Sequence, residues 1–239
     1  RMQSEGISPD QFTCSCIMKV CGSIGAIDEG QKIHDEILSR GFHTEDMMLF
    51  RTALLDMYAK CGMLAKAQNV LEDLPIRDVV SWSALIAGYA QQGQGHEALN
   101  CLKHMQNEGI SPDAITLRSV LNSCRWSGLL NEAQMLYGNM SNKYGILPVI
   151  EHQTCLVNLF GRAGYFDEAM SIMKDMLTFD YPIWIAILGA CQKWGNVKLG
   201  RLAFDQAIQL DPLSGAAYAC MSNIYVAARM HEEAETIEA

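Results

Sequence analysis

A glycine followed five residues later by a small residue recurs along the whole chain. Neighbouring copies are 37, 31, 35, 36, 31 and 34 residues apart. A period of this length is typical of stacked arrays of helix pairs, so the chain corresponds to about seven repeats rather than to one or two globular domains. The pairs are Gly25/Gly30, Gly62/Ala67, Gly93/Ala98, Gly128/Ala133, Gly164/Ala169, Gly195/Gly200 and a degenerate copy with Arg229 before Ala234.

Each repeat is predicted to contain two helices. Between Val79 and Asp113, apolar residues at helical spacing precede Gly93 and resume after it. The segment Gly-Ile-Ser-Pro-Asp, at 6–10 and again at 109–113, would end one helix, and its aspartate could cap the next. The small residue after each turn lets the two helices approach closely. We therefore expect an all-α solenoid.

The amino-acid composition argues against several classes of protein. Hydrophobic residues make up 49% of the 239 residues and charged residues 19%, which argues against a disordered tail. The net charge of -9 argues against a non-specific nucleic-acid or membrane-surface binder, if the charge is evenly spread. The nine cysteines contain no Cys-x-x-Cys, which favours reduced thiols in an intracellular or organellar compartment and no zinc site. Because the sequence opens at Arg1, it is expected to be a piece of a longer protein.

Four stretches carry a specific family resemblance: MYAKCG at 57–62, VVSWSALIAGYAQQGQGHEAL at 79–99, GRAGYFDEA at 161–169 and LGACQKWGNVKLG at 188–200. Together they resemble the PLS subclass of plant pentatricopeptide repeat proteins, which are organellar RNA-binding helical solenoids. The resemblance covers essentially the whole chain. It implies a right-handed α-solenoid of stacked helix-turn-helix repeats of about 35 residues.

The resemblance also divides the chain into repeat types. Residues 1–10 resemble the tail of a P-type repeat. Residues 181–239 resemble the tetratricopeptide-like E motifs that follow the repeats in this family, the second one truncated. Between them lie an L-type repeat at 11–47, including a two-residue insertion, an S-type repeat at 48–78, a P-type repeat at 79–113, an L-type repeat at 114–149 and an S-type repeat at 150–180.

In this family the fifth and last residues of each repeat select one RNA base. The complete pairs here are Thr52 with Asp78, Ser83 with Asp113, and Thr154 with Asp180. An ionised carboxylate only accepts hydrogen bonds, so the combination suits the donor-rich edge of guanine, which the family's code also assigns to it. We expect an RNA element with two adjacent guanines, one unread nucleotide and a further guanine.

The remaining base-selecting candidates have incomplete or unusual pairs. Asp10 is a last residue whose partner would lie before Arg1. The L-type pairs, Ser15 with Glu45 and Arg118 with Val149, do not fit the usual code, so no base is assigned to them. Helix capping is the alternative role for the Ser/Thr and Asp pairs, since both residue types are favoured there. The family resemblance favours base recognition.

Leu49, Val80 and Ile115 stand at the second position of their repeats, where the family places aliphatic side chains against the faces of bases. The alternative is ordinary packing at the start of a helix. Basic residues near these helices could contact phosphates. The candidates are Lys19, Lys60, Arg125 and Arg162.

The charge is divided unevenly between the predicted helices. The thirteen residues before each turn position contain seven basic and two acidic residues, a net +5 that leaves -14 for the rest of the chain. The resemblance implies that these first helices line an RNA groove. Counterion release could operate there even on an acidic protein, with modest and strongly salt-sensitive affinity.

The chain is not expected to be an enzyme or to hold a cofactor or metal. Related proteins often continue into a zinc-dependent cytidine deaminase domain, which needs His-x-Glu and Pro-Cys-x-x-Cys. The His-x-Glu sequences at 34–36 and 231–233 lack a following Cys-x-x-Cys and are expected on solvated faces of second helices. Cys21, Cys124 and Cys191, each four residues before a turn glycine, are expected to be small packing residues rather than nucleophiles.

These features predict a site-recognition factor for C-to-U editing of single-stranded RNA in mitochondria or chloroplasts, with no membrane association. A deaminase or editing cofactors would dock through the E-like end and the L-type repeats. The candidate docking segments are residues 199–207 and 216–226, which could instead only cap the solenoid. Two alternatives stay open: a scaffold that binds proteins without RNA, and an RNA-binding factor for splicing or transcript stability.

Overall fold

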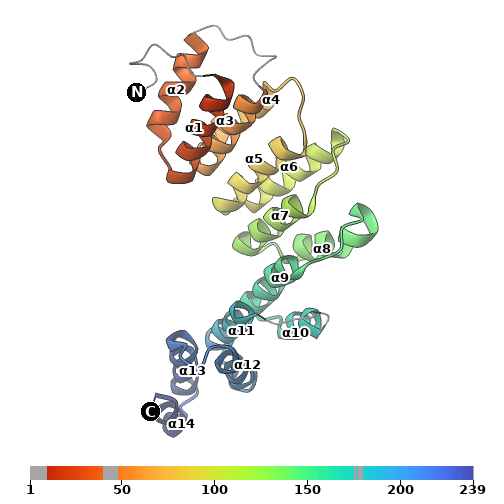
Figure 1. Cartoon of the computed structure of the whole chain (residues 1–239). Coiled ribbons are helices and arrows are strands. Elements are labelled where there is room, and N and C mark those ends of the chain that lie inside the picture. Colours follow the sequence, from red (N-terminus) through yellow and green to blue (C-terminus); the bar gives the residue numbers. More distant parts are fainter. Residues whose placement is uncertain (1–9, 40–47, 175, 177–179, 239) are drawn as a thin grey trace. The chain divides into compact units, whose positions relative to one another are not determined.

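A computed structural model describes residues 10–39, 48–174, 176 and 180–238, with the side chains of Gln11, Leu38 and Glu238 excepted. These residues form fourteen α-helices and no strand (Figure 1). The first helices of successive pairs are α1 (Gln11–Ile24), α3 (Met48–Lys60), α5 (Val79–Gln91), α7 (Ala114–Ser127), α9 (Ile150–Ala163), α11 (Tyr181–Trp194) and α13 (Gly215–Ala227). The second helices are α2 (Ile27–Ser39), α4 (Leu64–Glu72), α6 (Gly95–Asn107), α8 (Leu130–Tyr144), α10 (Phe166–Lys174), α12 (Val197–Leu210) and α14 (His231–Glu238).

The helices belong to two compact blocks. The N-terminal block, Arg1–Ser127, holds α1 to α7, and the C-terminal block, Gly128–Ala239, holds α8 to α14. The helices of the expected repeat at 114–149 are therefore divided between the blocks. The first six of these helices, at Gln11, Met48, Val79, Ala114, Ile150 and Tyr181, begin at the first residue of an expected repeat or of the E-like segment. Whether these repeats are of P, L, S or E type stays a prediction.

In the N-terminal block, the first helices pack side by side in chain order (Figure 1). Helix α3 packs against α1 and α5, and α5 packs against α7. The second helices α2, α4 and α6 each contact the first helix of their own pair and that of the next pair. Met18, Leu55, Leu85 and Leu117 are fully buried between these helices. Stacking thus covers apolar faces that no single pair could bury alone.

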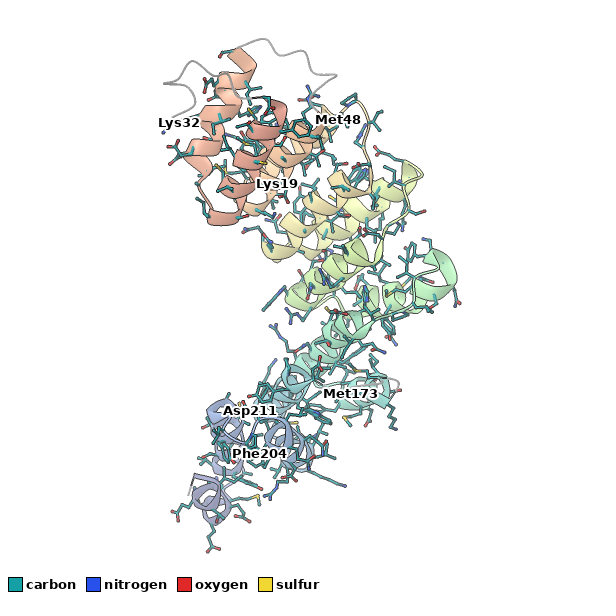
Figure 2. All side chains as sticks on the ribbon, viewed as in Figure 1. Lys19, Lys32, Met48, Met173, Phe204 and Asp211 are labelled. Atoms are coloured by element: carbon teal, nitrogen blue, oxygen red, sulfur yellow. The ribbon has the colours of Figure 1, made fainter. Side chains whose placement is uncertain are left out.

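The first helices of the C-terminal block also pack side by side. Helix α11 packs against α9 and α13, and α10, α12 and α14 each pack against their own first helix. Met173 is buried on α10, which packs against α9. Phe204 on α12 contacts the Tyr218 ring edge-to-face, with the ring centroids 5.2 Å apart. Met173 and Phe204 are labelled in Figure 2. The described residues therefore confirm the all-α solenoid expected from the period.

The turns between paired helices explain the repeated glycines. Gly25, Gly62, Gly93, Gly128, Gly164 and Gly195 all have φ between 68° and 87°, in the left-handed region that favours glycine. Arg229, at the degenerate seventh position, takes the same conformation with φ 60°. The small residues five positions after each turn are all buried, as expected. In all seven copies, the residue that the sequence period places at the turn therefore has a left-handed backbone conformation.

The cysteines expected to pack do so. Cys21, Cys124 and Cys191 are at most 5% exposed, and burial raises the pKa of the Cys191 thiol to about 12. All nine cysteines are free. Within the described ranges, no group of three or more His, Cys, Asp or Glu side chains could hold a metal ion. Nor is any helix there long and apolar enough to cross a bilayer.

The expected solvated face is wrong for His34. Its ring is half-buried on α2, and Nδ1 lies 2.9 Å from the Tyr58 hydroxyl of α3. Tyr58 is itself only 3% exposed, so the two rings join the helices in an interior contact that helical spacing alone does not indicate. His231, by contrast, is exposed at the start of α14.

Candidate RNA-binding surface

The three fifth-position hydroxyls make the same local hydrogen bond. Each donates to the carbonyl of the first residue of its own helix: Thr52 to Met48 at 3.0 Å, Ser83 to Val79 at 2.6 Å and Thr154 to Ile150 at 2.7 Å. All three side chains are half-buried. A hydroxyl has one proton, so these bonds leave each oxygen to face a ligand as an acceptor.

Three of the last-residue aspartates cap the following helix. One Oδ1 atom of each accepts the backbone N–H three residues on, from Thr13 to Asp10 at 2.8 Å, from Ser81 to Asp78 at 2.8 Å and from Thr116 to Asp113 at 2.7 Å. The capping alternative is thus realised. It leaves the second carboxylate oxygen of each exposed aspartate outside these bonds, so capping and base recognition are compatible.

Asp10 is tied further to its helix. Its Oδ1 also accepts the Thr13 hydroxyl at 2.6 Å, and the two bonds from Thr13 lower the pKa of the Asp10 carboxyl. Asp180 differs, because it stands before α11 in extended conformation and makes no side-chain capping bond. The third residue beyond it is Ile183, which has no hydroxyl and donates its N–H to the Asp180 carbonyl. Neither carboxylate oxygen of Asp180 therefore accepts a capping hydrogen bond from α11.

The L-type candidates are arranged differently from the Ser/Thr and Asp pairs. Ser15 is 8% exposed, so it lies deeper than the other fifth-position hydroxyls, and its partner Glu45 lies outside the described residues. Arg118 is exposed on α7 in the N-terminal block, whereas Val149 belongs to the C-terminal block. No base is assigned to either L-type pair, as the sequence predicts.

The second-position side chains are exposed. Leu49, Val80 and Ile115 have exposed fractions of 55%, 56% and 59%, so ordinary core packing does not account for them. Phe12 occupies the same position in the first described helix and is 60% exposed. Sequence reasoning missed Phe12, although its place as second residue of the repeat at 11–47 was a sufficient signal. An exposed aromatic ring can stack on a base.

The four phosphate-contact candidates are not equivalent. Lys19 on α1 and Arg162 on α9 are exposed, and Lys19 is marked in Figure 2. Lys60 is paired with Asp56 at 2.7 Å, which offsets its charge. Arg125 lies over the Trp126 ring at 4.5 Å, with its Nε atom buried and lacking a hydrogen-bond partner among the described residues.

Several apolar side chains of the candidate docking segments are buried inside the C-terminal block. Phe204, Ala207, Met221 and Ile224 are all buried there. A guanidinium N–H of Arg201 donates to the Tyr225 hydroxyl at 2.7 Å, which joins α12 to α13 and raises the pKa of Arg201. The large apolar side chains that stay exposed in these segments are Leu202 and Val226.

Comparison with protein-family models places most of these helices in one family. Residues 77–125 match the model described as the PPR repeat family, and residues 12–42, 51–79 and 154–181 match the PPR repeat. These segments together make up more than half of the chain. The matches include Ser83, Asp113 and Thr154, which belong to the Ser/Thr and Asp pairs.

Curated relatives carry the same repeats. The chloroplastic pentatricopeptide repeat-containing protein CRR2 of Arabidopsis thaliana is 35% identical over 237 residues, which are 99% of this chain and 36% of that protein. The mitochondrial pentatricopeptide repeat-containing protein At3g53360 of the same plant is 37% identical over 227 residues, 95% of this chain and 29% of that protein. The chain therefore spans about a third of the length of these relatives.

The fold also matches solved structures. The pentatricopeptide repeat protein PPR10 from maize aligns with 99% of this chain and 40% of its own, at a TM-score of 0.59 and 19% identity. PPR10 in complex with an 18-nt psaJ RNA element aligns with 99% of this chain and 45% of its own, at a TM-score of 0.52 and 16% identity. At these identities the likeness shows the fold alone. By its repeat matches, its relatives and its helical architecture, the chain belongs to the pentatricopeptide repeat family.

Proposed function

We propose that the chain binds single-stranded RNA in a sequence-specific way, through the fifth and last residues of its repeats. The observation that carries this proposal is the common hydrogen bond of Thr52, Ser83 and Thr154, which gives all three hydroxyls one orientation. Three chemically equivalent acceptors at repeat spacing are what a base-per-repeat reader requires. The related PPR10 is described in complex with an RNA element, which makes RNA the first ligand to test.

The donor and acceptor pattern favours guanine. A carboxylate and a hydroxyl whose proton is committed to the backbone together offer two acceptors. On its Watson–Crick edge guanine has two adjacent donors, N1–H and N2–H2, whereas adenine and cytosine each present an acceptor nitrogen beside a single amino group. We therefore propose guanines opposite the repeats at 48–78, 79–113 and 150–180, with one unread nucleotide opposite 114–149. Leu49, Val80, Ile115 and Phe12 would lie against base faces.

Fluorescence anisotropy with short RNAs tests this proposal. Replacing the two adjacent guanines by adenines is expected to weaken binding at least tenfold, since at each base an acceptor nitrogen would face an acceptor oxygen. A matched RNA changed only at the unread nucleotide should bind as before. Equal affinity for all three RNAs would refute base recognition. No binding at either low or moderate salt would favour the protein-binding scaffold instead.

The cellular role that we propose is recognition of C-to-U editing sites, with the deaminase supplied by another protein. Support comes from the PLS-like order of repeats, the E-like segment at 181–239 and the curated relatives whose names carry chloroplastic and mitochondrial labels. Leu202 and Val226, exposed on neighbouring helices of the C-terminal block, are the proposed contact points for a partner.

Sequencing of organellar transcripts from plants lacking the gene tests this role. Loss of C-to-U conversion at a site preceded by the proposed guanines is the expected result. Unchanged editing with altered splicing or transcript level would transfer the role to splicing or stability. A complementing gene with both Leu202 and Val226 changed to serine should bind RNA normally and fail to restore editing.

A further inference from the structure

The pair Ser83 and Asp113 is joined by a third residue that lies outside the two base-selecting positions. Thr116, the third residue of α7, places its Oγ1 atom 2.5 Å from Ser83 Oγ and 2.7 Å from Asp113 Oδ1. Its side chain is 0% exposed, so it cannot contact a base itself. Ser83 stands on α5 and Asp113 at the start of α7, so the bridge also spans two adjacent first helices.

The bridge contains two hydroxyl protons, one from Ser83 and one from Thr116. Ser83 Oγ contacts the Val79 carbonyl at 2.6 Å and Thr116 Oγ1 at 2.5 Å, while Thr116 Oγ1 contacts the Asp113 carboxylate at 2.7 Å. Two protons must serve these three contacts. The carboxylate is the strongest acceptor, so the Thr116 proton belongs to Asp113. The Ser83 proton then goes to Thr116 or to Val79, and in both cases it stays within the protein.

We infer that Thr116 is a positioning residue that sets the base specificity of the pair Ser83 and Asp113. It does so by fixing the Asp113 carboxylate relative to the Ser83 hydroxyl, since Thr116 Oγ1 contacts both groups. The Ser83 oxygen and the second Asp113 carboxylate oxygen are then held at one spacing, which suits the N1–H and N2–H2 donors of guanine and opposes the N1 acceptor of adenine. This inference rests on the proposed function and adds a residue to it.

The neighbouring pair provides a comparison within the same block. Among the described residues, Thr52 and Asp78 are not bridged: the Thr52 hydroxyl bonds to Met48, and the Ser81 hydroxyl bonds back to the Asp78 backbone. Both pairs have the same residue chemistry, but only one has its hydroxyl tied to its carboxylate. The unmodified protein should therefore prefer guanine over adenine more strongly opposite the repeat at 79–113 than opposite the repeat at 48–78.

Anisotropy measurements on the 239-residue chain test the inference. Four RNAs are needed, with guanine or adenine opposite the repeat at 79–113 and, separately, opposite the repeat at 48–78. Thr116→Val is expected to lower the guanine preference about three- to tenfold at the first nucleotide and to leave the second unchanged. Thr116→Ser, which keeps the hydroxyl, should retain the preference. Ser81→Ala is the matched control and should leave the preference opposite 48–78 intact.

The outcomes separate this inference from the proposed function. A protein that shows no guanine preference before any substitution would contradict the proposed function. A protein that prefers guanine equally at both nucleotides, and keeps that preference in Thr116→Val, would overturn the role of Thr116 alone. If Thr116→Val fails to fold by circular dichroism, the comparison of Thr116→Ala with Thr116→Ser asks the same question.

Discussion

At the scale of single residues, the backbone demands of the turn are the clearest link from sequence to fold. Six of the seven turn positions are glycine, and the seventh, Arg229, holds a left-handed conformation that costs a side-chain-bearing residue free energy. The repeat register could be predicted from the sequence because this demand recurs. The Thr116 bridge could not, because its partners come from two helices whose relative placement no local pattern specifies.

Arg229→Gly is expected to stabilise the chain by about 0.5–1 kcal/mol, since glycine adopts positive φ without the Cβ clash and loses part of that gain through unfolded-state entropy. Thermal unfolding followed by circular dichroism measures the change. The converse control is Gly25→Ala, at a turn where an added Cβ meets no atom within 4 Å. It should destabilise by about 1 kcal/mol through backbone conformation alone. Two substitutions with no effect would show that the turns carry no conformational cost.

At the scale of helices, close approach and buried polar contacts decide how neighbouring elements pack. The small residue after each turn was predictable from the period, because helix pairs need it. The contact between His34 and Tyr58 was not, since helical periodicity assigns a residue to a face without naming what lies opposite. Gly88 on α5 is a similar case. A Cβ atom added to Gly88 would lie 2.8 Å from the Cβ and 3.1 Å from the Cα of Ala59 on α3.

Gly88→Ala should destabilise the chain by about 1–3 kcal/mol, because the backbone of α3 would have to move away from α5. Denaturant unfolding measures this. Gly138→Ala is the matched control, in the interior of α8 with no atom within 4 Å of an added Cβ. There the better helix propensity of alanine should add about 0.5–1 kcal/mol. A stabilised Gly88→Ala protein would contradict the close approach of α3 and α5.

The contact between α2 and α3 should make stability depend on pH. Burial lowers the pKa of His34 from its ordinary value of 6.5. Between that lowered value and 6.5 the unfolded chain binds more protons than the folded one, so the free energy of unfolding falls as pH falls through this window. Below the folded-state pKa the loss from this group stops growing.

Unfolding midpoints at pH 7.5 and 5.5 measure this loss. His34→Gln should reduce the difference between the two pH values, while the same replacement at exposed His231 should leave it unchanged. An identical difference in His34→Gln and the unmodified protein would show that the ring of His34 does not titrate in this way.

At the scale of the whole molecule, charge distribution matters more than net charge. The chain carries -9 overall, yet its first helices are net basic and its second helices and loops hold the acidic excess. The stacked-helix architecture could be predicted from the period, whereas the base-selecting role of the Ser/Thr and Asp pairs stays a prediction. Which lysines and arginines remain available could not, because pairs such as Lys60 with Asp56 form only once the side chains are placed.

Lys19→Gln is expected to reduce the salt dependence of RNA binding. Each lost phosphate contact on a single strand should make the slope of log K against log salt concentration shallower by about 0.7. The control is Lys32→Gln, on second helix α2 in an exposed pair with Glu29 at 2.7 Å (Figure 2). Its slope should match that of the unmodified protein. Equal slopes for all three proteins would remove Lys19 from the RNA path.

A double-mutant cycle between protein and RNA tests base recognition most directly. The cycle combines Ser83→Asn with replacement of guanine by adenine at the nucleotide opposite the repeat at 79–113, and measures all four dissociation constants. If Ser83 selects this base, the two changes should be coupled by about 1 kcal/mol or more, and the adjacent nucleotide should show none of this coupling. Purely additive changes, with no coupling at either nucleotide, would contradict the account.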